Sequence, residues 1–474
     1  MPVSDVLEAA ERGLERLRED RTRLDRIDRY LRGEHDDPYY PKSATTEYRR
    51  LAKRAVSNWL PLLVKTPAQA LAVEGYRRSD AGPEDSGSSA EWQAWQANRM
   101  DARQAAVHRA ALGYGAAFVV VLPDPTNAGG YPLIRGASPR LTYASYDDPA
   151  SDETPLWALQ VERLPSAGGG EVRGWLYDDQ GVTEVVLGGE GRPRTTGYVR
   201  HGMGVCPVVR LAADIDLEGR VAGVVEPVIP IQDRINQTVF DLLIAQTFGS
   251  FKVRAISGMA PEFERDPETG DVIYDSQTGK PKPLAIQADA SRFLIAPDPD
   301  TRFATLDETP LAGFLEAIES GVRGMAAVSQ TPPHYLLGSV VNLSAEALAA
   351  AEAALTRAVD EYKHLFGESW ELVLRLCARV AGVAEDERAQ VVWKDAESRS
   401  LSQTVDALGK AVQMLNVPAR ALWLRIPGVT ATDVEQWAQM AEQDDPALRL
   451  ADSLTQAATA PPVPPEDGAA DAPA

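Results

Sequence analysis

The chain has 474 residues, of which 44% are hydrophobic, 25% charged and 7% aromatic, a composition typical of globular proteins rather than disordered ones. At roughly 150 residues per domain, this length predicts about three domains. The net charge of −21 lacks the basic excess that a sequence-independent nucleic-acid binder needs, and no apolar run approaches the ~20 residues of a membrane-spanning helix, so no membrane association is expected.

The N-terminal part of the chain predicts helices joined by surface loops. Residues 3 to 32 repeat leucine and isoleucine at spacings of three, four and seven, which indicates one long amphipathic helix. The first residues lack the apolar core of a signal peptide, which favours synthesis and use in a cytoplasm. A second helix is expected from about residue 44. A third, with Trp92 and Trp95 as core residues rather than base-stacking ones, runs to residue 113.

The middle of the chain changes first to strands and then back to helix. Residues 131 to 212 contain short β-branched runs separated by glycine turns, which predicts an antiparallel β region. A helix follows Pro230 and ends near Gly249. Residues 251 to 309 contain one strand-like run and two Thr-Gly turns, which suggests a small separate module.

The C-terminal third is predicted to be helical around one irregular segment. A helix at 310 to 328 leads into SQTPPHYLLGSVVNL at 329 to 343, where Pro332 and Pro333 argue against helix. Ser344 then caps a helix of almost forty residues. The sequence VVWKDA reads as a strand, two or three short helices follow it, and the proline-rich acidic end is expected to be disordered.

No pattern of catalytic or metal-binding residues stands out. The five histidines are isolated, and Cys206 and Cys377 are far apart, so no metal site is predicted. The GxSxG elbow and the phosphate-binding GxxxxGK[ST] loop are missing. Carboxylate pairs such as Asp147-Asp148 are better explained as solvated loop charge than as Ca²⁺ ligands. We therefore expect no catalytic residues and no cofactor.

The order of these elements resembles that of the portal proteins of tailed bacteriophages, especially the long-tailed phages of actinobacteria. The resemblance covers roughly residues 1 to 445. Four stretches carry it: NWLPLLVKTPAQALAVEGYR at 58 to 77, EPVIPIQDRINQTVFDLLIAQTF at 226 to 248, SQTPPHYLLG with NLSAEAL at 329 to 348, and FGESWE at 366 to 371.

This resemblance implies an α+β fold, mainly helical, in a portal-like subunit with wing, stem, clip and crown regions assembled into a ring. The implied regions are the wing with N-terminal helices and inserted antiparallel β region at 1–224, the first stem helix at 225–250, the clip at 251–309, the second stem helix at 310–328, the tunnel loop at 329–343, the long wing helix at 344–382, the crown at 383–445 and a disordered tail at 446–474.

The resemblance also implies which residues line a channel for DNA. The candidates of the tunnel loop are Gln330, Thr331, Pro332, Pro333, His334, Tyr335 and Asn342, and those of the first stem helix are Gln232, Asn236 and Gln237. Arg234, Lys252 and Arg254 are candidate phosphate contacts, with ordinary surface salt bridges as the favoured alternative. Because cationic walls bind phosphates, a polar or acidic wall would let DNA slide.

The implied function is a ring channel at one capsid vertex through which double-stranded DNA is packaged and ejected without sequence specificity. The implied partners are other copies of this chain in a dodecamer, a terminase motor, a head–tail adaptor, and the major capsid and scaffold proteins. The virion is the expected location, with the host cytoplasm during assembly. Two alternatives remain open: a protein-only scaffold or adaptor of the virion, and a metal-dependent hydrolase.

Overall fold

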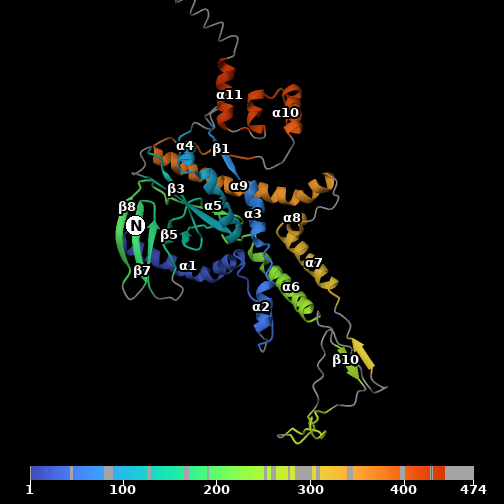
Figure 1. The fold of residues 1–474 in the computed structure, drawn as a ribbon. Helices are drawn as coiled ribbons and strands as arrows, with labels where there is room; N and C mark the ends of the chain where they lie inside the picture. The colour runs from blue at the N-terminus through green and yellow to red at the C-terminus, as the bar shows by residue number, and fades with distance from the viewer. Residues whose placement is uncertain are drawn as a thin grey trace, which may run out of the picture. The chain divides into compact units, whose positions relative to one another are not determined.

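The computed structural model contains both helices and strands, with helices prevailing (Figure 1). The described residues are 2–42, 46–79, 89–124, 130–164, 170–188, 192–249, 254–257, 263–275, 278–282, 302–305, 310–338, 345–394, 401–426, 429 and 431–443. The predicted disordered tail, 446–474, therefore lies outside the described residues. Among the described helices, none is long and apolar enough to cross a membrane.

The chain divides into two compact units, and each is built from separate stretches of sequence. The first unit consists of Met1–His35, Asn58–Gln232 and Val322–Ala474. The second unit consists of Asp36–Ser57 and Asp233–Gly321. Two helices, α6 (Ile229–Gly249) and α7 (Ala312–Val328), begin in one unit and end in the other.

In the first unit, a long helix covers one face of an antiparallel sheet. Helix α1 (Val3–Leu31) confirms the predicted N-terminal helix, and its apolar stripe packs on the sheet through Val6, Leu14 and Leu17. The strands follow the chain order β4 (Thr142–Ser145), β5 (Trp157–Val161), β6 (Glu171–Tyr177), β7 (Gly181–Gly188) and β8 (Arg194–Arg200). Gly13 permits close contact here, since a Cβ on it would lie 3.1 Å from Leu159.

A second, three-stranded sheet lies next to helices of the same unit. Its order is β3 (Leu133–Ala137), β2 (Ala116–Leu122) and β9 (Val208–Ala212), all antiparallel. The helices α4 (Ala90–Ala97), α5 (Met100–Tyr114) and α9 (Ala345–Ala381) pack around it. The single helix predicted through Trp92 to residue 113 is wrong in detail: it breaks at Arg99, whose φ of 55° is left-handed.

The centre of this unit is an aromatic cluster. Trp370 and His108 are completely buried, and Trp370 Nε1–H donates to His108 Nε2 at 2.8 Å. Trp95 meets Trp370 edge-on, and Phe366 stacks on His108 at 5.3 Å between ring centres. These contacts join α4, α5 and α9, so helices distant in sequence share one core.

The first unit also contains four further helices, a 3-10 helix and a pair of strands. Helix α3 (Leu60–Ala70) leads into β1 (Val73–Arg77), which pairs antiparallel with β12 (Gln390–Trp393). Helix α8 (Pro333–Leu337) precedes α9. The C-terminal helices are α10 (Leu401–Leu415), the 3-10 helix η2 (Ala419–Arg425) and α11 (Ala431–Gln443), as the sequence predicts for this part of the chain.

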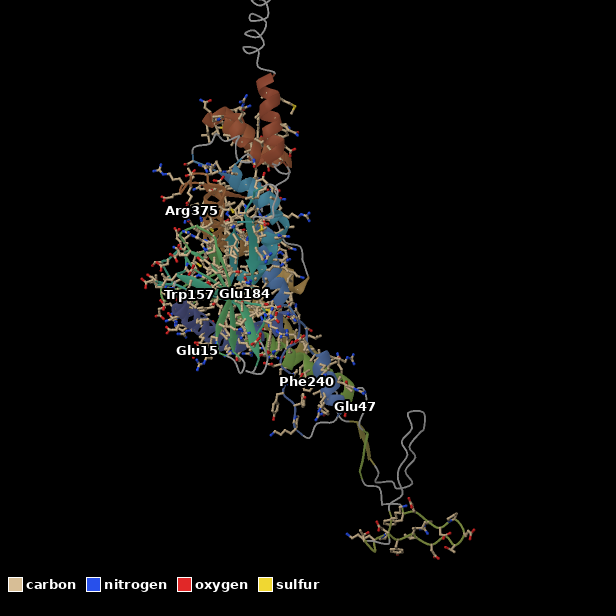
Figure 2. The ribbon with its side chains drawn as sticks, turned by 90° about the vertical axis from the view of Figure 1, so that its left-hand side faces the viewer. Glu15, Glu47, Trp157, Glu184, Phe240 and Arg375 are labelled. Atoms are coloured by element: carbon tan, nitrogen blue, oxygen red, sulfur yellow. The ribbon has the colours of Figure 1, made fainter. Side chains whose placement is uncertain are left out.

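The second unit contains helix α2 (Thr46–Arg54), the part of α6 from Asp233 onward, and the paired strands β10 (Arg254–Ser257) and β11 (Arg302–Thr305). The 3-10 turn η1 (Glu226–Val228), which precedes α6, belongs to the first unit. Helix α2 packs on α6 through Leu51 and Ala52 against Phe240 (Figure 2).

Within this unit, residues 263–282 carry two consecutive turns of the same design. Asp266 and Asp275 each accept a backbone N–H inside their own turn, at 2.8 and 3.2 Å. In each turn the glycine four residues later, Gly270 or Gly279, has positive φ and donates its N–H back to the aspartate carbonyl at 2.9 Å. These are the two Thr-Gly turns expected from the sequence.

Candidate channel region

The polar edge expected on the first stem helix is largely internal to the subunit. Gln232 and Asn236, one turn apart on α6, are 0% and 1% exposed. The side-chain oxygen of Gln232 accepts the N–H of Trp59, and that of Asn236 accepts the N–H of Ser57, both at 3.4 Å. The expectation that these two amides face a channel is therefore corrected, because in the subunit they hold the 57–59 segment and have no surface to offer.

The other candidates of this region differ in exposure. Gln237 is half-buried and accepts the N–H of Tyr39 at 2.7 Å while it donates to Asp241 at 3.1 Å. Arg234 is exposed on α6. Lys252 lies outside the described residues, and of Arg254 only the backbone, in β10, is described. Of the stem candidates, Gln237 and Arg234 thus keep accessible surface.

The segment expected as an irregular tunnel loop contains a helix. Pro333 begins α8, which ends at Leu337 with Gly338 in the left-handed region. The expectation that Pro332 and Pro333 forbid helix is wrong, because a proline in the first turn lacks only an N–H that would be unpaired anyway. Gln330 has a φ of 53°, so the chain turns sharply between α7 and α8. Asn342 lies outside the described residues.

Contacts fix this segment to the rest of the first unit. Thr331 is 3% exposed and Pro332 is buried, whereas Gln330 and Pro333 are exposed. Trp59 Nε1–H donates to the carbonyl of Leu336 at 3.2 Å. Residues 329–338 are thus anchored by some side chains and exposed at others.

Two side chains of α8 also meet Glu352 of helix α9. The Tyr335 hydroxyl donates to the carboxylate of Glu352 at 3.3 Å, and His334 Nε2 lies 3.9 Å from the same oxygen. Burial and the charge of Glu352 raise the pKa of the Tyr335 phenol. These contacts brace α8 against the following helix.

The described charges on α6 and α7 are mainly acidic. The two helices together contain four acidic residues, Asp233, Asp241, Glu316 and Glu319, and two basic residues, Arg234 and Arg323. Such helices do not bind a polyanion tightly.

Sequence reasoning missed a basic helix in the same unit. Helix α2 has four basic residues among its nine, and all four are exposed: Arg49, Arg50, Lys53 and Arg54. Averaging charge over the first sixty residues conceals this helix, since the thirteen basic residues there are offset by twelve acidic ones. A window of one helix length would have revealed it.

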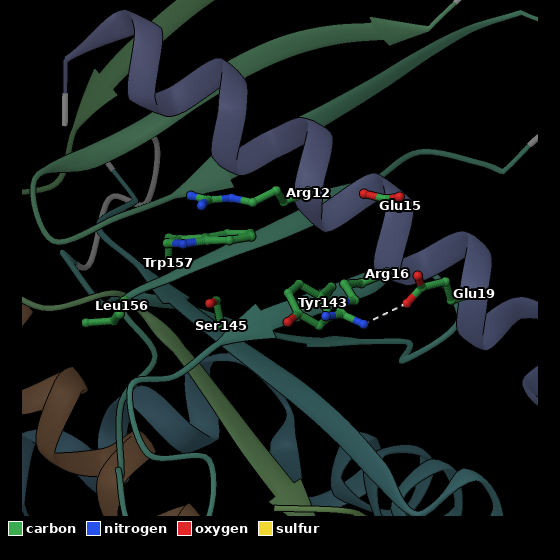
Figure 3. A pocket seen from close by; sticks show the side chains of 8 residues that line it. All are labelled: Arg12, Glu15, Arg16, Glu19, Tyr143, Ser145, Leu156 and Trp157. Atoms are coloured by element: carbon green, nitrogen blue, oxygen red, sulfur yellow. Dashed lines mark hydrogen bonds and ion pairs between the residues drawn. The ribbon is translucent and has the colours of Figure 1, made fainter.

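The sequence predicts no metal site, and the side chains of the described residues can be compared with that expectation. Among these residues, no group of three or more histidine, cysteine, aspartate or glutamate side chains is placed to hold a metal ion. An open groove of about 500 Å³ lies between α1 and the β4–β5 hairpin (Figure 3). Arg16 and Glu19 pair at 2.8 Å on its rim, and Tyr143 and Trp157 form its aromatic wall. Its lining has no histidine or cysteine to activate a nucleophile.

Comparisons with known proteins place this chain among the structural components of phage particles. The family model "Phage portal protein, SPP1 Gp6-like" matches residues 12–447. The chain therefore belongs to the phage portal protein family.

Two curated relatives carry the name portal protein. The one from Mycobacterium phage D29 is 28% identical over 363 residues, which is 74% of this chain and 71% of the relative. The one from Mycobacterium phage L5 is 27% identical over the same shares. A solved structure, the neck of an empty GTA particle computed with C6 symmetry, has a TM-score of 0.45 and 11% identity, covering 85% of this chain and 99% of the other.

Proposed function

We propose that twelve copies of this chain form a ring at one vertex of the capsid, and that double-stranded DNA enters and leaves through the ring. Membership of the portal family across residues 12–447 is the observation that carries this proposal. The interface between copies would be heterologous, because a closed ring repeats one rotation between two different surfaces of each subunit.

Each region of the proposed ring subunit corresponds to one or two segments of this chain. Residues 1–224 and the helix at 344–382 would form the wing, 225–250 and 310–328 the stem, 251–309 the clip, 329–343 the tunnel loop and 383–445 the crown. The helix bounds of α6, α7 and α9 support this division, since they begin and end within a few residues of those limits.

The channel wall is proposed to include Gln237 of α6 and the exposed side of the 329–343 segment, above all Gln330, Pro333 and Tyr335. The acidic balance of α6 and α7 supports a wall that does not hold DNA, since few cations are present to replace the counterions of the phosphates. Arg234 would supply at most an isolated phosphate contact.

The proposed partners dock on the clip and around the wing. A terminase motor would dock during packaging and a head–tail adaptor afterwards, while major capsid and scaffold proteins would surround the wing. The chain itself is proposed to be non-enzymatic, so a separate ATPase would supply the force. The site of action would be the virion, with assembly in the host cytoplasm.

Native mass measurement of the purified full chain, followed by averaged electron images, tests the ring. We expect a closed ring with a central channel wide enough for duplex DNA. A compact monomer at every concentration would contradict the proposal. Oligomers without a channel would favour the scaffold or adaptor reading, and metal-dependent turnover would favour the hydrolase reading.

Positive charge added to the proposed channel wall tests whether these positions meet the passing DNA. Gln237→Lys with Gln330→Lys places cations at two proposed wall positions, and we expect intact rings with reduced DNA filling of particles, because each lysine adds a phosphate contact. The matched control, Gln237→Glu with Gln330→Glu, should leave filling near the wild-type level. Equal filling in both variants would show that these positions do not line the channel.

A further inference from the structure

Helix α2 presents a basic stripe that the second unit leaves exposed. Arg49, Arg50, Lys53 and Arg54 recur at helix spacings of one, three and four, and so occupy the face opposite the buried Leu51 and Ala52. No ion pair joins these four cations to another residue in the described ranges. Residues 42–54 contain five basic residues and a single acid, in a chain with a net charge of −21.

Helix α7 presents the opposite charge in the same unit. Glu316 and Glu319 are exposed, and the segment 306–321 contains four acidic residues and no basic one. Leu315 lies beside the two glutamates on the same side of the helix and is 58% exposed. This flank of α7 therefore presents two carboxylates beside one exposed apolar side chain.

The two charged helices pack on different faces of α6. Helix α2 contacts Phe240 and its neighbours Val239, Leu243 and Ile244. Helix α7 approaches at Gly321, where a Cβ would lie 2.7 Å from the side chain of Ile235. At 3.6 residues per turn, Ile235 is roughly a third of a turn from the centre of the α2 contacts. In Figure 1, α6 accordingly lies between α2 and α7, so the basic and acidic surfaces border the unit on different sides.

We propose that the basic stripe of α2 in one copy of this chain docks on the exposed flank of α7, formed by Leu315, Glu316 and Glu319, in the next copy. The occupant is a second copy because it brings an acidic flank whose charge is opposite in sign to that of the basic stripe. Two complementary surfaces on different sides of one unit produce a head-to-tail contact, which repeats into a ring. The inference thus rests on the proposed ring and specifies one of its contacts.

Reversing charges on either helix tests the contact in the full-length chain. Arg50→Glu with Lys53→Glu, or Glu316→Lys with Glu319→Lys, should raise the subunit concentration at half assembly by at least about tenfold, since attractive pairs become repulsive. Combining all four substitutions in one chain restores opposite charges between the substituted positions, while Arg49 and Arg54 remain positive, and assembly should return part of the way toward wild type. Added salt should weaken wild-type assembly.

A control variant separates this contact from a general effect of charge. Arg12→Glu with Arg18→Glu makes the same change in net charge on the exposed side of α1 and should leave assembly unchanged. Circular dichroism of each variant checks that the helices remain folded.

The outcomes distinguish this inference from the proposed function. Rings that tolerate both double reversals, or that the four-fold variant fails to restore, would overturn the α2–α7 contact and leave the ring standing. If the wild-type chain forms no ring at any concentration, the proposed function and this contact both fail.

Discussion

The buried histidine at the centre of the first unit makes stability depend on pH in a way that one substitution should remove. Trp370 Nε1–H can only donate, so Nε2 of His108 is the acceptor and the ring proton sits on Nδ1, which donates to the Leu71 carbonyl at 3.2 Å. Burial lowers the pKa of His108 to about 4, although the Leu71 contact opposes this shift. The folded state therefore holds the neutral ring.

The size of the effect follows from the difference between folded and unfolded pKa. An unfolded histidine titrates near 6.5, so between pH 6.5 and 4 the unfolded chain binds a proton that the folded chain excludes. The contribution is fully present above pH 6.5 and is lost as pH falls toward 4. At 1.36 kcal/mol per pKa unit, the free energy of unfolding should fall by about 3 kcal/mol over this range, and by about 2 kcal/mol at pH 5.

His108→Gln is the test, because glutamine does not titrate and offers both an amide N–H and a carbonyl to the two partners. We would measure urea unfolding by tryptophan fluorescence for both proteins between pH 7.5 and 4. The free energy of unfolding of wild type minus that of the variant should decrease as pH falls, because only the wild type carries His108. The titration of the carboxylates that both proteins share cancels in this difference. A difference that stays constant across the range would refute the reasoning.

Three further predictions address local structure. Gly115→Ala should destabilise the first unit by about 1–3 kcal/mol in urea unfolding, because φ there is 98° and a Cβ would lie 2.9 Å from neighbouring backbone, whereas Gly130→Ala, with open space around it, should cost less. Gln232→Leu should cost about 1–3 kcal/mol by leaving a backbone N–H without its acceptor; an unchanged urea midpoint would refute its structural role. Burial raises the pKa of the Cys206 and Cys377 thiols, so both should resist a thiol reagent until the chain is unfolded, and rapid labelling of the folded protein would contradict this.

Helices with long periodic patterns were predictable because their signals are local. The spacing of apolar residues indicates α1 and α9 almost to their ends, and α9 begins at Ala345, within one residue of the predicted start. The strand runs at 142–145, 157–161 and 171–177 also follow the predicted β-branched segments. In these stretches local preference and tertiary structure agree.

The candidate channel residues were harder to place because their environment comes from distant parts of the sequence. Gln232 and Asn236 lie on the polar side of their helix by periodicity, yet the backbone that buries them belongs to residues 57–59. No spacing rule within α6 reveals that partner. Pro333 differs from expectation for another reason: proline disrupts the interior of a helix, but Pro333 is the first residue of α8, where its missing N–H costs nothing.

The two turns at 266–270 and 275–279 have a practical use. Each is closed by hydrogen bonds of its own aspartate and glycine, and the segments beside the turns pair with one another, as the Ile273 N–H does with the Glu264 carbonyl at 2.8 Å. Loops of this kind accept inserted peptides with little effect on the rest of a fold. A short epitope or fluorophore-binding tag placed between Thr278 and Gly279 would open the second turn, and would give a reporter attached at a known point of the second unit, distant in sequence from both charged helices.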